Sequence, residues 1–301
     1  MKIVFNRIKD SIKIVAPASK GPNFDKVIEE FSSLCKEYNI NYLVSEDLFN
    51  DKCLPFYSNS FEYRCKDFLN ALEDDRVKII WSIRGGYGSS EIANLLKDYK
   101  IKSPKILIGF SDITSLHVLF NNYYSLPSIH GAMIFDILNE IKIKNLRDIF
   151  DLMLKPCEIR YELTKINANN EVVEGNITGG NLTVLCSNIG GLLKVEHFEN
   201  KILFLEDVGE ISYKIQRCLM QLYNGGFLSK IRAIIFCQFT NSDQYLERTI
   251  EDFVNEYCKI PAFRFDFIGH GEINLPLILG TNAKIIGKNL IVENSFEIVL
   301  L

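Results

Sequence analysis

The chain has 301 residues and a mass of 34.5 kDa, and its 47% hydrophobic and 24% charged residues provide enough apolar material for one large or two ordinary cores. A formal net charge of −4 with scattered lysines excludes a general electrostatic attraction to nucleic acid or anionic lipid. The beginning of the chain lacks the features of a signal peptide, and no apolar stretch has membrane-spanning length. We therefore expect a cytoplasmic globular protein with no nucleic-acid or membrane partner.

Strand-like and helix-like segments alternate through the first half of the chain. Strands are expected within 12–19, 40–45, 77–86 and 105–110, and helices over about 24–38, 60–72, 89–99, 112–123 and 146–154. Strands that alternate with helices of 10–15 residues indicate βαβ units around a parallel sheet. The sequence therefore predicts an α/β domain over residues 1–158.

The second half has a different texture at its beginning. Residues 157–180 alternate polar and apolar side chains between Asn and Gly turns, which suggests short, partly antiparallel strands. Strands at 202–207 and 231–239 follow, each succeeded by a helix, over about 213–223 and 245–257. We expect a second α/β domain over residues 159–301, and 155–175 is the only plausible linker.

Cysteine and histidine usage argues against disulfides and metals. The eight cysteines lie no closer than 12 residues apart, and several stand in apolar segments, so we expect buried free thiols. No C-x-x-C or H-x-H pair occurs, and the four histidines are well separated. We expect neither a metal site nor a cofactor.

Ser111 follows the apolar run 106–109 at the expected turn from a strand into a helix. A serine on such a turn presents its hydroxyl, while the next amide, that of Asp112, points outward and can bind an oxyanion. The pattern G-x-S-x-G is half met, because Gly109 is present and Ile113 replaces the second glycine. The alternative is a helix N-cap with no chemistry.

A serine hydroxyl needs a base, and the base needs an orienting acid. His117 belongs to the same helical pattern as Ser111 and is too far round to meet it, and His197 lies in a polar turn. His130, in IHGAM, and His270, in GHGEINLPL, stay candidates for the base. Glu206 at the end of ILFLED is the candidate acid, and a solvated strand end is the alternative.

Two glycine-rich turns complete the set. Gly85, Gly86 and Gly88 end the strand at 77–86, so their amides could bind an anion or a tetrahedral oxygen. Gly179 and Gly180 lead into Asn181, where the backbone can approach a ligand. The alternative for both is a plain tight turn.

Taken together, these motifs resemble the LD-carboxypeptidase family of serine peptidases. The resemblance spans nearly the whole chain and rests on the order IVAPAS, RGGYG, GFSDIT, IHGAM, GGNL, LFLEDVGE with Arg217 in the next helix, and GHGEINLPLILGTNA. It implies a catalytic triad of Ser111, Glu206 and His270, with oxyanion donors at Gly86 and Asp112. It also implies a flavodoxin-like or amidotransferase-like N-terminal domain, a swivelling C-terminal α/β domain, and a homodimer.

The function implied by the resemblance is hydrolysis of the amide to the C-terminal D-alanine of murein tetrapeptides, a step of cell-wall recycling. A carboxylate in such a substrate would need a cation, and Arg84 is the nearest in sequence, although a surface ion pair is as good an interpretation. Two alternatives stay open: a microcin C immunity-type hydrolase of aminoacyl-nucleotides, and a non-catalytic module that binds an anionic peptide or nucleotide. The resemblance implies that immunity members stack an aromatic ring, typically tryptophan, on the nucleobase from a loop between the serine and the glutamate. The only tryptophan here, Trp81, precedes Ser111, which favours the peptidase branch but leaves that role open to a tyrosine or phenylalanine.

Overall fold

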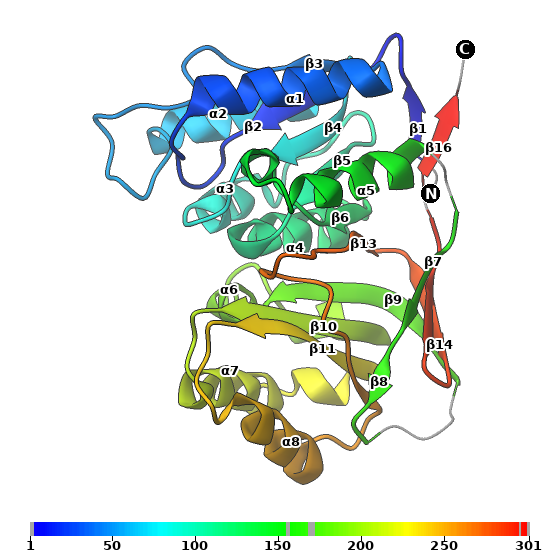
Figure 1. Ribbon diagram of the computed structural model, residues 1–301. Coiled ribbons are helices and arrows are strands. Elements are labelled where there is room, and N and C mark those ends of the chain that lie inside the picture. The colour runs from blue at the N-terminus through cyan, green and yellow to red at the C-terminus, as the bar shows by residue number, and fades with distance from the viewer. Residues whose placement is uncertain (1–2, 155–156, 168–171, 295, 300–301) are drawn as a thin grey trace.

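The computed structural model describes residues 3–154, 157–167, 172–294 and 296–299. Two sheets with their helices are stacked one above the other, and the two chain ends lie on the same side of the molecule (Figure 1). A separate two-stranded parallel ribbon joins β1 (Ile3–Asn6) to β16 (Phe296–Val299). The first and the last described strands therefore lie side by side.

The upper sheet is built from five strands of the first half of the chain and one strand, β13, of the second half. Its strands have the order β13-β6-β5-β4-β2-β3, and the five from β6 to β3 run parallel. The strands are β2 (Ser11–Val15), β3 (Asn41–Leu43), β4 (Val77–Ser82), β5 (Ile106–Gly109), β6 (Ser128–His130) and β13 (Leu277–Leu279). The helices are α1 (Phe24–Tyr38), α2 (Phe61–Glu73), α3 (Ser89–Leu96), α4 (Thr114–Asn122) and α5 (Ile143–Leu154), with short 3₁₀ turns η1 (Ser111–Ile113) and η2 (Ile134–Leu138).

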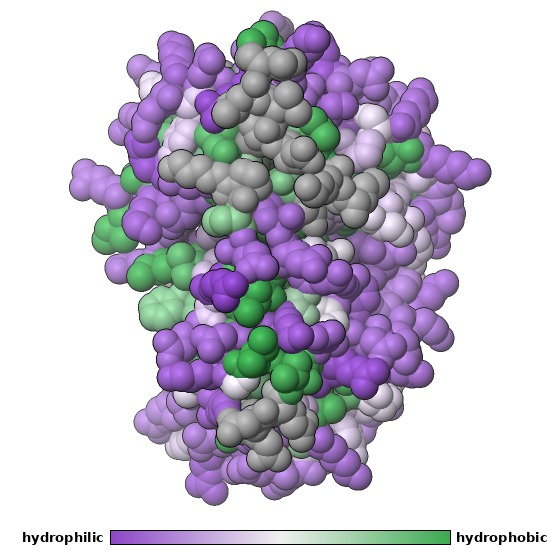
Figure 2. All heavy atoms as spheres, turned by 90° about the vertical axis from the view of Figure 1, so that its right-hand side faces the viewer, coloured by the Kyte–Doolittle hydropathy of each residue, from purple (hydrophilic) through white to green (hydrophobic). Residues whose placement is uncertain are grey.

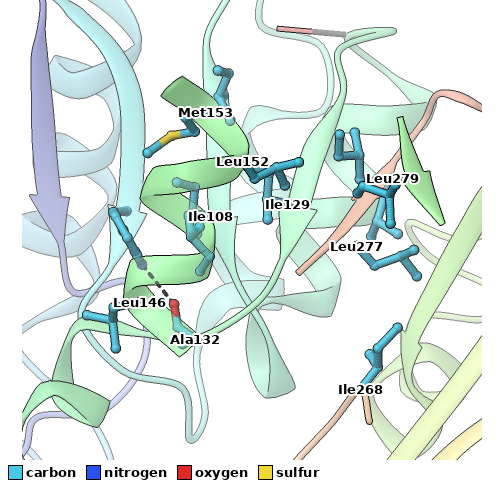
Figure 3. Close-up of a cluster of buried hydrophobic side chains, with 14 of the residues drawn as sticks. Ile108, Ile129, Ala132, Leu146, Leu152, Met153, Ile268, Leu277 and Leu279 are labelled. Carbon is cyan, nitrogen blue, oxygen red and sulfur yellow. Dashed lines mark hydrogen bonds between the residues drawn. The ribbon is translucent and has the colours of Figure 1, made fainter. Parts of the chain in front are cut away.

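Successive side chains of a strand point to opposite faces, and both faces of this sheet are buried because helices cover each of them. Ile108 of β5 packs in the cluster with α1 and α5, whereas Leu107 packs in the cluster with α2, α3 and α4. Figure 3 shows Ile108 and Ile129 facing Leu146 and other side chains of α5. The indole of Trp81 is fully buried in this layer and donates a hydrogen bond to the Ala132 carbonyl, 2.9 Å away.

The lower sheet is mixed and has the order β7-β15-β14-β9-β10-β11-β12-β8. Its central strands β9 to β12 run parallel, and the outer ones are antiparallel. The strands are β7 (Ile159–Glu162), β8 (Thr164–Lys165), β9 (Val172–Asn181), β10 (Lys201–Val208), β11 (Ala233–Thr240), β12 (Ala262–Arg264), β14 (Asn282–Ile286) and β15 (Asn289–Val292). Three helices pack on one face, namely α6 (Leu182–Ser187), α7 (Ser212–Asn224) and α8 (Leu246–Tyr257). Two short 3₁₀ turns, η3 (Val195–Phe198) and η4 (Phe227–Ser229), complete the described elements.

The α/β prediction is confirmed, and the two halves of the chain are interleaved. Strand β13 belongs to the second half in sequence, yet it pairs antiparallel with β6 at the edge of the upper sheet. Leu277 and Leu279 of β13 approach the upper core in Figure 3. Of the expected linker 155–175, residues 155–156 and 168–171 lie outside the described residues, and the rest contains β7, β8 and the beginning of β9.

The thiols require a correction. All eight cysteines are free, but only five are buried; Cys53 and Cys218 are half-buried and Cys157 is exposed. Cys157 lies in the connection between α5 and β7. On the molecular face that carries both chain ends, hydrophilic residues predominate and the apolar ones form small groups (Figure 2). Among the described residues, no helix combines the length and apolar character that crossing a bilayer requires.

Candidate active site

Ser111 stands at the carboxyl end of β5, where the chain turns into η1 and then α4. Its φ of 62° lies in the left-handed region, which non-glycine residues seldom adopt and which is common at functional turns. The turn is crowded: a Cβ atom added to Gly85 would lie 3.1 Å from the Ser111 Cβ and 3.3 Å from its Oγ. The glycine at the end of β4 therefore lets the backbone approach the serine closely.

Glu206 and His270 form a hydrogen-bonded pair. His270 Nδ1 lies 2.6 Å from Glu206 Oε2, and the Glu206 side chain is completely buried. Strand β10 carries a register shift between Leu205 and Asp207 against β11, and such a bulge redirects the side chain at that point. Burial alone would raise the pKa of Glu206, but His270 and His130 outweigh it and lower that pKa to about 2. Glu206 is therefore a buried carboxylate at neutral pH.

The turn that carries His270 is held from both halves of the chain. Gly269 has a φ of 134°, and the Gly271 amide donates to Gln238 Oε1 at 2.7 Å. The Gly269 amide donates to Asn274 Oδ1 at 3.0 Å. Asn145 of α5 in turn accepts from the Asn274 amide and donates to the Glu272 carbonyl. This network fixes the imidazole at the junction of the two layers.

The structure brings His270 to the residue next to the serine. The ring centroids of Phe110 and His270 lie 4.7 Å apart, so the imidazole packs directly beside the turn of Ser111. Within the described part of the chain, the Ser111 hydroxyl makes no hydrogen bond with His270. Catalytic hydrogen bonds are often long before substrate binds and tighten afterwards. Of the predicted triad, Glu206 and His270 are thus hydrogen-bonded, and Ser111 adjoins Phe110, against which the His270 ring packs.

Gly86 occupies a backbone conformation that favours glycine, with a φ of 116°. A Cβ added there would lie 2.0 Å from Ser19 Oγ. The Ser19 hydroxyl donates to the Phe56 carbonyl at 2.6 Å and accepts from the Tyr87 amide at 3.3 Å, which anchors the turn. The other expected oxyanion donor, the Asp112 amide, lies in the first turn of η1, where amides have no intrahelical acceptor.

The side chain of Asp112 links the serine turn to the glycine turn. The Asp112 Oδ2 accepts a hydrogen bond from the Ser89 amide at 2.9 Å, and the backbone carbonyl of Asp112 accepts one from the Ser89 hydroxyl. Ser89 is the first residue of α3, directly after the glycines at 85–88. Burial raises the pKa of Asp112 to about 6, and the hydrogen bonds from Ser89 oppose this only in part.

Replacing Asp112 by asparagine tests the raised pKa through the pH dependence of stability. A carboxyl group whose pKa is raised on folding stabilises the fold fully below its unfolded value, 3.8, and loses that contribution as pH rises through about 6. Asparagine does not titrate. The unfolding free energy of Asp112→Asn minus that of wild type should therefore increase between pH 4 and 7, by at most about 3 kcal/mol. Urea unfolding at several pH values measures the difference. A difference that does not change with pH would contradict the raised pKa.

Two further predicted site residues have different surroundings. Arg84 is exposed at the end of β4 and donates to the Lys20 carbonyl at 2.8 Å. Asn181 is buried beside Glu206 in the parallel register of β9 and β10. Its side chain accepts from the Val184 amide as the N-cap of α6 and donates to Asp207 Oδ1 at 3.0 Å. The observed contacts of the Asn181 side chain are thus internal to the fold.

Sequence reasoning left the place of His130 open and did not find the supporting amides. His130 ends β6, is completely buried, and has its Nε2 3.8 Å from Glu206 Oε1. His117 is also buried, within α4, and His197 is half-buried in η3. The short motif IHG, with glycine after a strand-like step, was the one signal for His130. Asn145 and Gln238 carry no local signal, because each acts on a turn far away in sequence.

Comparison with known proteins finds the two domains of one family in the two halves of the chain. The family described as LD-carboxypeptidase N-terminal domain matches residues 12–131, and the one described as LD-carboxypeptidase C-terminal domain matches residues 174–285. A carboxypeptidase-like protein of Rickettsia conorii is 35% identical over 283 residues, which cover 92% of this chain and 88% of that protein. The murein tetrapeptide carboxypeptidase of Pseudomonas aeruginosa is 27% identical, over 94% of this chain and 95% of that protein.

Solved structures share the fold. The muramoyltetrapeptide carboxypeptidase from Oxalobacter formigenes superposes with a TM-score of 0.79 at 24% identity, covering 94% of this chain and 99% of that chain. The microcin C7 self immunity protein in complex with aspartyl sulfamoyl adenosine gives a TM-score of 0.80 at 19% identity, covering 96% of this chain and 97% of that chain. The arrangement of two stacked sheets is therefore common to a peptidase and to an immunity protein.

Proposed function

Because the chain belongs to the LD-carboxypeptidase family and is a carboxypeptidase-type enzyme, we propose that it hydrolyses the amide to the C-terminal D-alanine of murein tetrapeptides. The observation that carries the proposal is the 2.6 Å hydrogen bond between Glu206 and His270, with the imidazole packed beside the strained turn of Ser111. A serine, a histidine and a buried carboxylate are the groups that acyl transfer needs.

The proposed mechanism has two proton-coupled steps. Ser111 Oγ attacks the peptide carbonyl while His270 Nε2 takes the hydroxyl proton, and the same imidazolium then protonates the departing amine of D-alanine. Water, deprotonated by His270, then attacks the acyl-enzyme. The imidazolium returns this proton to Ser111 Oγ as the peptide acid is released. The amides of Gly86 and Asp112 receive the oxyanion in both steps, and one such donor is typically worth about 2.7–4 kcal/mol of barrier.

Glu206 has two functions in this scheme. Its Oε2 accepts a hydrogen bond from the Nδ1–H of His270, which leaves Nε2 free to act as the base. Burial raises the pKa of Glu206, but His270 and His130 lower it by more, to about 2. The carboxylate therefore stays ionised while the imidazolium forms. Its negative charge then stabilises the imidazolium in a buried setting, where the interaction is stronger than in water.

Arg84 is the proposed partner of the substrate's terminal carboxylate. It lies two residues beyond the end of β4 and directly before Gly85, which approaches Ser111, and its side chain is exposed. One guanidinium nitrogen is used on the Lys20 carbonyl, and Arg84 makes no ion pair with any described residue. The remaining donors suit a carboxylate in a bidentate geometry.

The second candidate function is hydrolysis of an aminoacyl-nucleotide, as the likeness to the immunity protein suggests. Trp81 does not favour it, because the indole is completely buried and bonded to the Ala132 carbonyl, so it cannot stack on a nucleobase. Cell-wall recycling, a cytoplasmic location and a homodimer stay predictions.

A substrate comparison tests the proposal. The purified protein is incubated with disaccharide tetrapeptide ending in D-alanine, with its isomer ending in L-alanine, and with an aminoacyl sulfamoyl adenosine, and released amino acid is followed by mass spectrometry. We expect release of D-alanine only. Release from the nucleotide alone would assign the immunity branch, and binding of either ligand without turnover would assign a binding module.

A further inference from the structure

Three buried polar atoms beside the candidate triad have no hydrogen-bond partner among the described residues. They are Glu206 Oε1 and both ring nitrogens of His130. The two side chains are completely buried, and His130 Nε2 lies 3.8 Å from Glu206 Oε1. This separation is roughly 1 Å longer than an N–H···O hydrogen bond. A buried carboxylate oxygen without a hydrogen-bond donor is costly, and His130 Nε2, 3.8 Å away, is a nitrogen that can supply one.

Among the described residues, neither ring nitrogen of His130 makes a hydrogen bond, and the rings that neighbour it are aromatic. Its ring packs edge-on against Phe204 at a centroid distance of 5.0 Å and against Phe110 at 5.8 Å. His117, whose ring centroid is 6.2 Å away, is already used on both sides. Its Nδ1 lies 2.8 Å from Ser128 Oγ and its Nε2 2.9 Å from the Gly109 carbonyl. A carbonyl needs a donor, so His117 carries its proton on Nε2 and does not compete for Glu206.

We propose that His130 is a positioning residue: in the working enzyme its Nε2–H donates to Glu206 Oε1, so that the carboxylate is held between two imidazoles. One small side-chain adjustment would then satisfy two of the three orphaned atoms at once. Oε2 remains the acceptor for His270, and the two oxygens have separate, fixed tasks. The kinetic consequence of this contact rests on the proposed function, whereas the contact itself does not.

The position of His130 explains why such a device is available in this fold. Strand β6 lies between β5, which leads to Ser111, and β13, which follows the His270 turn, and His130 is paired with Leu277 of β13. The position of a donor at the end of β6 therefore depends on both neighbouring strands, β5 and β13. Fixing the carboxylate limits rotation of the Glu206 side chain, so the His270 ring is presented to Ser111 in one orientation.

The test uses variants that separate packing from donation. His130→Phe keeps an aromatic ring between Phe110 and Phe204 but removes the donor, and His130→Gln restores an N–H near the Nε2 position. With the tetrapeptide substrate we expect His130→Phe to lower kcat on the order of 10- to 100-fold with little change in KM, and His130→Gln to recover most of it. His197→Phe, the same change at a half-buried histidine in η3, is the control and should retain full activity.

A spectroscopic readout decides the contact without turnover. The chain has four histidines, so ¹⁵N-labelled imidazoles can be assigned one by one. We expect His130 to carry its proton on Nε2 and this proton to resonate downfield, then to move upfield in Glu206→Gln because a hydrogen bond to a neutral group is weaker. A His130 proton on Nδ1, or equal losses of kcat in His130→Phe and His130→Gln, would overturn the proposal. If wild type cleaved neither substrate, the proposed function would fail while this spectrum still decided the role of His130.

Discussion

Ser111→Ala is expected to abolish release of D-alanine, with kcat falling on the order of 10⁴- to 10⁶-fold. The alanine keeps the Asp112 amide and the substrate contacts but has no hydroxyl to form the acyl-enzyme. Binding of the tetrapeptide should persist, because the proposed site for the carboxylate and the glycine turn are unchanged. Stopped assays by mass spectrometry measure turnover, and calorimetry with the intact tetrapeptide measures binding.

The structure supplies a matched control for this substitution. Ser125 also has a left-handed φ, of 54°, and is exposed three residues beyond the end of α4. Ser125→Ala therefore makes the same chemical change in the same backbone conformation away from the candidate site. Both variants should unfold within a few degrees of wild type, in keeping with substitutions that remove no buried contact. Equal activity in Ser111→Ala and Ser125→Ala would remove Ser111 from the mechanism.

Glu206→Gln is expected to lower kcat by about 10⁴-fold while leaving the fold intact. A glutamine amide can donate to His270 Nδ1, which would hold the proton on Nε2 and leave no base facing Ser111. It also removes the negative charge that stabilises the imidazolium. Glu210→Gln is the control: this carboxylate lies four residues further on, is half-buried and pairs with Lys214 at 3.0 Å, so its loss should cost little activity.

The stability of Glu206→Gln should depend on pH in the opposite sense to that of Asp112→Asn. A carboxyl group whose pKa is lowered on folding stabilises the fold above its unfolded value, 4.5, and loses that contribution as pH falls through about 2. Wild type should therefore be more stable than Glu206→Gln at pH 7, and the gap should narrow between pH 4.5 and 2. A constant gap in urea unfolding would mean that Glu206 is not held ionised by His270 and His130.

Local patterns predicted the elements of the first half closely. The amphipathic run expected at about 24–38 is α1 (Phe24–Tyr38), and the one at about 60–72 is α2 (Phe61–Glu73). The reason is physical: a surface helix repeats its buried side chains every three to four residues, and this repeat is visible without any knowledge of the partner surface. The strand-to-helix turn at Ser111 was predictable on the same ground, because strand, turn and helix signals are contiguous.

Other features depend on partners far apart in the chain. The sequence LPLILG reads as an apolar strand, but nothing in it says that β13 joins the sheet of the first half beside β6. The same holds for Asn145 of α5, which is hydrogen-bonded to Glu272 and Asn274 in the His270 turn, 127 and 129 positions away. Hydrophobic alternation specifies that a strand is buried, while the choice of neighbour is made by packing of the complete chain.

By itself, the sequence determined the α/β alternation, the glycines that permit close backbone approach, and the residue types able to carry acyl transfer, because each depends on neighbours within a few positions. Only the tertiary structure decided that Glu206 and His270, 64 positions apart, share a hydrogen bond, and that His130 stands on the other side of the same carboxylate. These contacts arise where the ends of β6 and β10 meet the turn before β13, and that meeting follows from the burial of two sheets against each other rather than from any local signal.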